Sequence, residues 1–115
     1  MLKKLVLKFL TSFGTPRAEV IDVLVSAIKV RPMPRLEAEK LIPIWRAYNE
    51  SKEHELPPIT LMSIDGGYYL FDGQHRLAVR AHNGHHTIAC EVIVRTEDHN
   101  LHLYTEDVDH LLELL

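Results

Sequence analysis

The stretch Tyr68-Tyr69-Leu70-Phe71-Asp72-Gly73-Gln74-His75-Arg76-Leu77-Ala78 carries the strongest structural signal in this chain. Its aromatic beginning is typical of a β-strand, and the pair Asp72-Gly73 is a turn signal. The spacing of apolar residues then predicts a helix from Gln74 to Asn83, with Gly84 just past its end. A helix that begins directly after a tight turn exposes unpaired backbone N–H groups and the positive end of its dipole. Such a turn is a ready binding site for an anion, and phosphate is the most obvious one.

Three further stretches predict β-strands. One lies within Val20–Val30, and the others are Ile59–Ile64 and Thr87–Val94, which are rich in β-branched residues. Asp65-Gly66-Gly67 is a hairpin signal between the second of these strands and Tyr68.

The helical signals are less uniform. An amphipathic helix is predicted within Leu36–Asn49, but proline suits only the first turn of a helix, so the helix either begins near Glu39 or breaks at Pro43. Thr105 is a candidate N-cap for a terminal helix that reaches Leu115. The order of elements predicts a small single-domain α+β fold, a mixed sheet with flanking helices. We expect an N-terminal extension at residues 1–17, the domain at 18–95 and an acidic C-terminal helix, packed on the domain, at 96–115.

Length and composition fit one soluble globular domain. The chain has 115 residues, of which 46% are hydrophobic and 25% charged. No apolar run is long enough to cross a bilayer, and we expect a cytoplasmic protein. The single cysteine, Cys90, excludes an internal disulfide and a four-cysteine zinc site, and its strand context predicts a small core residue.

The net charge of −3 is unevenly distributed. Residues 1–35 carry seven basic and two acidic side chains, whereas residues 96–115 carry six acidic side chains and no basic one. The basic beginning favours contact with phosphates, but the overall acidity argues against broad non-specific DNA binding by the isolated chain.

Five elements occur in the order seen in the ParB/sulfiredoxin-like superfamily, and the chain resembles this family over roughly residues 18–95. They are Arg31-Pro32-Met33-Pro34, Lys40 on a helix, Leu56-Pro57-Pro58-Ile59, Gly73-Gln74-His75-Arg76 and Thr87-Ile88. The first and third elements look most like sulfiredoxins, and the form Asp-Gly-Gln-His-Arg also resembles small ParB-like domains of phages and mobile elements.

The resemblance implies a nucleotide site. His75 and Arg76 match the pair that holds ATP phosphates in sulfiredoxins, Lys40 matches an assisting lysine, and Arg31 matches an arginine near the same phosphates. The backbone of Gly73 and Gln74 would complete the phosphate cradle. The implied cofactor is a nucleoside triphosphate, ATP or CTP, with Mg²⁺.

Three departures from the family pattern limit what can be carried over. Gln74 stands where sulfiredoxins have their nucleophilic cysteine, and an amide cannot attack as a thiolate does, so sulfinic-acid reduction is excluded. Pro43 and Ala47 stand where the sulfiredoxin helix has hydroxyl groups. The later phosphate motif, helix-turn-helix and dimerisation domain of chromosome-partition ParB proteins do not occur in this sequence.

Asp72 and His75 are the candidate catalytic residues. Asp72 could bind a Mg²⁺ ion that bridges phosphates, or could act as a general base toward a hydroxyl acceptor. The purely structural alternative is that Asp72 is the N-cap of the helix. His82, His85 and His86 invite a zinc interpretation, but exposed histidines beside an Asn-Gly turn are unremarkable.

Three functions are compatible with the sequence. The first is a nucleotide-binding domain, with phosphotransferase or nucleotide-hydrolysing activity. The second is a DNA-binding accessory protein or a nuclease, using Arg31, Arg35, Arg76 and Arg80. The third is a non-catalytic interaction module that forms a homodimer or binds a partner through its amphipathic ends.

Overall fold

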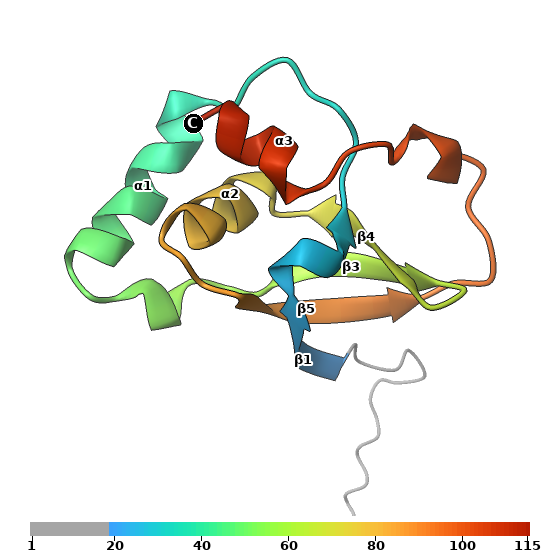
Figure 1. Ribbon diagram of the computed structural model, residues 1–115. Coiled ribbons are helices and arrows are strands. Elements are labelled where there is room, and N and C mark those ends of the chain that lie inside the picture. Colours follow the sequence, from blue (N-terminus) through green and yellow to red (C-terminus); the bar gives the residue numbers. More distant parts are fainter. Residues whose placement is uncertain (1–18) are drawn as a thin grey trace, which may run out of the picture.

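The computed structural model describes residues 19–115, which form a five-stranded mixed sheet with helices packed on it (Figure 1). The strand order is β1-β5-β3-β4-β2. The pairs β1–β5 and β3–β4 are antiparallel, and the pairs β5–β3 and β4–β2 are parallel. The predicted α+β class is therefore confirmed. The strands are β1 (Glu19–Leu24), β2 (Ile28–Lys29), β3 (Ile59–Ile64), β4 (Gly67–Asp72) and β5 (Thr87–Val94).

Three helices cover one face of this sheet (Figure 1). They are α1 (Ala38–Asn49), α2 (Gln74–His82) and α3 (Val108–Glu113), and single 3₁₀ turns lie at η1 (Val25–Ala27), η2 (Glu53–Glu55) and η3 (Leu101–Leu103). The centre of the core is fully buried and joins β3 and β5 to α2 and α3 through Ile59, Leu61, Leu77, Cys90 and Leu111. None of the helices within residues 19–115 is long and apolar enough to cross a membrane.

Local sequence signals located the central hairpin and the strands around it. Strands β3 and β5 have the predicted limits. The turn between β3 and β4 places Asp65 at φ +51° and Gly66 at φ +82°, the pair of positive angles that a type I′ hairpin turn requires. The buried Cys90 confirms the predicted core role of that thiol.

One of the two uncertain helix starts was predicted correctly, and the other needs correction. The terminal helix begins at Val108, and its N-cap is Asp107, whose carboxylate accepts a hydrogen bond from the Asp109 N–H at 3.0 Å. The prediction of Thr105 as the cap is wrong, because the Thr105 hydroxyl donates to the neighbouring Glu106 carboxylate instead. Helix α1 starts beside the predicted residue Glu39 and runs through Pro43 without a break.

The division of the chain into three regions stays a prediction. The proposed N-terminal extension at residues 1–17 lies outside the described residues. In the C-terminal region, Val108 and Leu111 belong to the main buried cluster. Helix α3 is thus part of the same core as the sheet.

Candidate functional site

Gly73 makes the sharp junction between β4 and α2. Its φ is +115°, and a Cβ atom at this position would lie 2.5 Å from Cγ2 of Ile59. Both the backbone angle and the lack of space therefore require glycine here. The strand is also irregular at this end, because Thr60 pairs with Asp72 while Leu61 pairs with Leu70, which leaves Phe71 as an extra, exposed residue.

The first turn of α2 leaves its backbone N–H groups available. Leu77 is the first residue whose N–H bonds back into the helix, to the Gly73 carbonyl at 2.9 Å. No side chain among the described residues caps this helix start. The N–H groups of Gln74, His75 and Arg76 thus lack a helical acceptor, as at every helix N-terminus.

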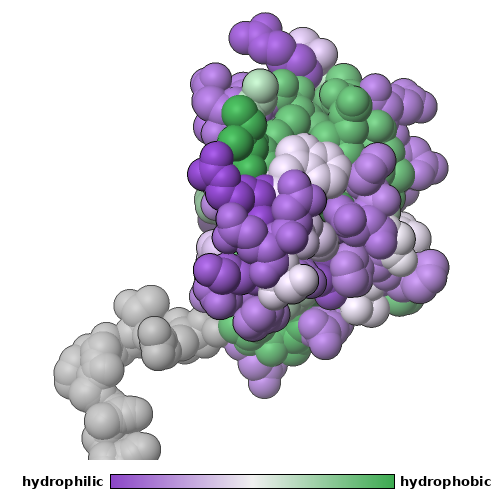
Figure 2. Space-filling model, turned by 90° about the vertical axis from the view of Figure 1, so that its left-hand side faces the viewer, coloured by the Kyte–Doolittle hydropathy of each residue, from purple (hydrophilic) through white to green (hydrophobic). Residues whose placement is uncertain are grey.

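A hollow of about 440 Å³ opens over this turn. It brings together residues from the start of α1, from the loop before β3 and from the β4–α2 junction: Glu39, Lys40, Pro43, Ile44, Leu56, Pro57, Asp72, Gly73, Gln74, His75 and Arg76. We call it the turn hollow. The face of the molecule on which α1 lies is largely hydrophilic, and its hydrophobic side chains gather toward the top of the view (Figure 2).

Six of the seven residues predicted for the site line the turn hollow. The exception is Arg31, which lines an adjoining hollow. Gln74 lines both and so forms their common wall. The second hollow, here called the connector hollow, is otherwise lined by Val30, Pro32, Met33, Leu70, Phe71, Tyr104 and Leu111.

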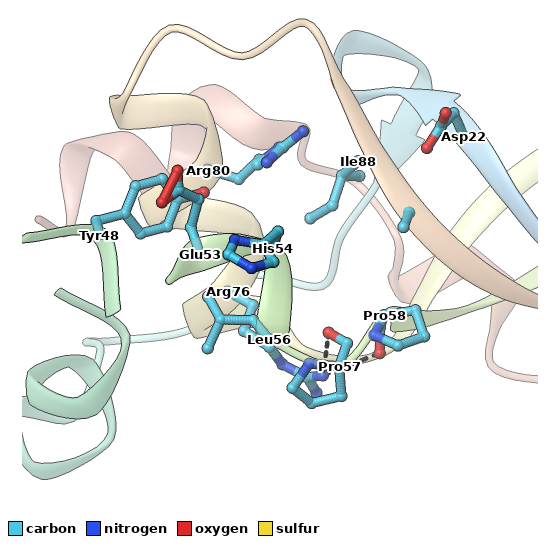
Figure 3. A pocket seen from close by; sticks show the side chains of 11 residues that line it. Asp22, Tyr48, Glu53, His54, Leu56, Pro57, Pro58, Arg76, Arg80 and Ile88 are labelled. Carbon is cyan, nitrogen blue, oxygen red and sulfur yellow. Dashed lines mark hydrogen bonds between the residues drawn. The ribbon is translucent and has the colours of Figure 1, made fainter. Parts of the chain in front are cut away.

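The Arg76 guanidinium is held by the protein. Its Nη1 donates to the carbonyls of Pro57 (3.0 Å) and Pro58 (2.9 Å) (Figure 3). Its Nη2 lies 3.4 Å from Oδ2 of Asp72. The side chain is 21% exposed. Arg76 therefore fixes the loop before β3 to the first turn of α2 and keeps its positive charge at the edge of the hollow.

The His75 ring faces the start of α1. The residue is 7% exposed, and Nε2 accepts a hydrogen bond from the backbone N–H of Glu37 at 3.0 Å. An accepting Nε2 means that the ring is neutral and carries its proton on Nδ1. Burial, and secondly the ammonium of Lys40, lower the pKa of His75, while Glu37 opposes them. In this arrangement the ring supplies no positive charge to the turn hollow.

Lys40 and Asp72 are exposed charged groups of the turn hollow, and Glu39, which also lines it, is exposed as well. Lys40 Nζ lies 3.5 Å from Oε1 of Glu37, with its side chain 57% exposed. The Asp72 side chain is 69% exposed, and its residue precedes the N-cap Gly73. The capping role considered for Asp72 is thus not observed. Exposed pairs of this kind are weak, so both side chains can turn toward a ligand.

The donor set suits a magnesium–phosphate group better than a protein-only metal site. Residues 19–115 contain no group of three His, Cys, Asp or Glu side chains that could hold a metal ion. Two of the three histidines considered for zinc lie beside aromatic rings of α1. The ring centroids of His82 and Trp45 are 5.2 Å apart in an edge-to-face arrangement, and those of His85 and Tyr48 are 6.0 Å apart. Mg²⁺ commonly uses one or two carboxylates together with phosphate oxygens, and Asp72 can supply one.

A third hollow is also bordered by Arg76 (Figure 3). It shares Leu56, Pro57 and Arg76 with the turn hollow. Its remaining lining is Asp22, Tyr48, Glu53, His54, Pro58, Arg80, Ile88 and Ala89. Oε1 of Glu53 is buried there without a hydrogen-bond partner among the described residues.

Sequence reasoning missed the residues that position this site. Glu37 and His110 bond to partners 38 and 77 positions away, and Tyr104 lines the connector hollow far from the motif. No local pattern marks them. The only sequence signal for the buried position of His75 is the apolar face of α2, because a histidine in the first turn beside that face is a candidate for burial. The sequence does not indicate that Glu37 is its partner.

Comparison with solved structures shows the fold. Sulfiredoxin from Arabidopsis thaliana matches with a TM-score of 0.58 and 22% identity, over 68% of this chain and 88% of that one. The chromosome-partitioning protein ParB from Caulobacter crescentus, C-terminally truncated and complexed with CTP-gamma-S, matches with a TM-score of 0.50 and 18% identity. The fold is ParB/sulfiredoxin-like.

These likenesses concern the fold, because both identities are low. The ParB match covers 70% of this chain but 46% of that protein. No family model and no curated protein matches the sequence.

Proposed function

We propose that this ParB/sulfiredoxin-like domain binds the phosphates of a nucleoside triphosphate in the turn hollow. The observation that carries the proposal is the uncapped first turn of α2, which opens beside Lys40 into a hollow of suitable size. Backbone N–H groups at a helix start bind phosphate without any particular side chain. The ParB structure complexed with a CTP analogue supports the same use of this fold.

Each residue of the site has a defined part in this proposal. The N–H groups of Gln74, His75 and Arg76 contact phosphate oxygens, and the Lys40 ammonium turns from Glu37 toward them. Asp72, which would otherwise repel the anion, holds Mg²⁺ when that ion is bound, and Mg²⁺ neutralises part of the phosphate charge. Sugar and base extend past Arg76 into the third hollow, with which the turn hollow shares three residues.

Phosphoryl transfer to a hydroxyl compound, or nucleotide hydrolysis, is the activity to test on this site. Arranged donors of this kind act by stabilising charge on the transferred group. Asp72 stays a predicted catalytic residue, whereas Nε2 of His75, the other residue predicted for catalysis, is already occupied by the Glu37 N–H. Gln74, the common wall of two hollows, lies where an acceptor in the connector hollow would meet a terminal phosphate.

Calorimetric titration with ATP, ADP and CTP, with and without Mg²⁺, tests the binding. Lys40→Gln is the informative variant, since the side chain is exposed and its removal leaves the fold intact. We expect affinity to fall about threefold to tenfold for loss of one charged contact. Lys52→Gln is the matched control, because Lys52 is also a lysine near a glutamate with its side chain 58% exposed. Absence of binding, or equal losses in both variants, would refute the proposed site.

A further inference from the structure

The segment from Val30 to Glu37, here called the connector, is tied down by residues far away in the sequence. Val30 exchanges two backbone hydrogen bonds with Glu106, at 2.8 and 3.1 Å. The N–H of Met33 donates to Nε2 of His110 at 2.9 Å. The N–H of Glu37 donates to Nε2 of His75 at 3.0 Å. The connector is thus anchored at its start, middle and end.

The two histidines make the same kind of hydrogen bond to the connector, although they belong to different helices. His75 belongs to α2 and His110 to α3, and each accepts a backbone N–H at Nε2. Each ring must therefore be neutral with its proton on Nδ1. Prolines at 32 and 34 restrict the backbone around Met33 and remove two donors. The few N–H groups that remain consequently determine where this segment can lie.

Both hollows depend on where the connector lies. Arg31 and Met33 line the connector hollow directly. Glu37 is the N-cap of α1, and Lys40, one turn later, lines the turn hollow. A shift of this segment would therefore move a cation in each hollow.

We propose that His75 and His110 are positioning residues, which hold the connector so that Arg31 lines the connector hollow and Lys40 lines the turn hollow. Helix α3 is in this view a part of the binding machinery, since it carries the ring that fixes Met33. The claim about ligand binding rests on the proposed function. The claim about the connector concerns the protein alone.

Amide hydrogen exchange of the full chain, followed residue by residue by NMR, tests the connector claim. In His110→Ala we expect the Met33 amide to exchange at least about threefold to tenfold faster, as loss of one hydrogen bond implies. In His110→Gln the side-chain carbonyl can accept the same bond, so protection should be largely restored. Amides of Leu61 and Cys90 in the core report whether the whole fold has weakened, and His99→Ala, at an exposed position, is the control. Unchanged Met33 protection in His110→Ala would overturn the claim.

Titration of the same variants with MgATP tests the ligand claim. We expect weaker binding in His110→Ala, recovery in His110→Gln and wild-type affinity in His99→Ala. A released connector with unchanged affinity would refute the positioning role. If the wild-type protein binds no nucleotide, the proposed function and the ligand claim both fail, and the exchange data still decide whether the histidines hold the connector.

Discussion

Gly73 shows how one residue can determine whether the site exists. The chain leaves β4 and enters α2 within a single residue, and the positive φ makes this possible. A side chain at this position meets Ile59, which is fully buried and cannot move away easily. The position combines backbone strain with overpacking, two costs that add.

Gly73→Ala is predicted to lower the free energy of unfolding by about 2 kcal/mol or more, because it incurs both costs. Gly84→Ala is the control, since Gly84 has φ +81° but open space around its missing Cβ. That variant should lose about 1 kcal/mol from the backbone conformation alone. Urea unfolding measures both, and equal losses would contradict the steric argument.

His75 couples stability to pH. Its pKa in the folded protein lies below the ordinary 6.5, chiefly because the ring is buried. The unfolded chain therefore binds more protons than the folded one as the pH falls below about 6.5. The stabilisation from the neutral ring is complete above that pH and is lost as the pH falls toward the folded pKa.

The expected result is a smaller drop in urea midpoint between neutral and mildly acidic pH for His75→Gln than for the wild type. Glutamine keeps an acceptor for the Glu37 N–H but does not titrate. The carboxylates, which are the same in both proteins, contribute equally to the two pH dependences, so the difference between the proteins reports on His75. An identical pH dependence in the two proteins would show that His75 does not titrate in this range.

Cys90 is protected by the sheet. Burial, and secondly the charge of Asp22, raise the pKa of its thiol to about 12. The thiolate is the reactive form. We expect an aromatic disulfide reagent to leave the native thiol unmodified at mildly alkaline pH and to react rapidly with it once urea is added. The absorbance of the aromatic thiolate that the reagent releases measures the reaction. Rapid modification without urea would contradict the buried position.

At the scale of elements, Arg76 connects α2 to the loop before β3. Its guanidinium reaches two consecutive carbonyls, of Pro57 and Pro58, which lie outside the helices and strands. Arg76 also lines both the turn hollow and the third hollow. The same side chain therefore contributes to stability and to the shape of the site.

Arg76→Ala should lower the free energy of unfolding by about 2 kcal/mol, because two carbonyls lose a charged donor at a partly buried position. Arg35→Ala removes an exposed arginine and should change stability by less than about 0.5 kcal/mol. Thermal or urea unfolding distinguishes the two. Comparable small effects would mean that water replaces the guanidinium without loss.

At the scale of the whole molecule, the charge distribution favours a small ligand over a DNA duplex. The chain has a net charge of −3. Of the arginines considered for DNA, Arg76 and Arg80 already donate to backbone carbonyls, Arg80 through Nε to Thr87 at 2.9 Å. Arg31 lines a hollow with Gln74 and Tyr104.

We accordingly expect a short labelled duplex to show no tight, salt-dependent binding to the full chain in fluorescence anisotropy. Strong binding that weakens steeply with salt, and is lost in an Arg31→Ala, Arg35→Ala double variant, would instead favour the DNA-binding hypothesis. The predicted homodimer is measured in the same samples by sedimentation.

The sequence by itself determined what depends on neighbouring residues. Runs rich in β-branched residues defined β3 and β5, an Asp-Gly pair with two positive φ angles formed the hairpin, and Gly73 ended β4 and began α2. Backbone preference and side-chain periodicity act over a few residues, so these elements can be recognised without the fold. The tertiary structure alone decided that the His75 ring faces Glu37, that Arg76 bonds to two prolines, that Arg31 lies in a separate hollow and that His110 holds Met33. These contacts join segments 18 to 77 positions apart, and only the packing of three helices on one sheet brings such segments within hydrogen-bonding distance.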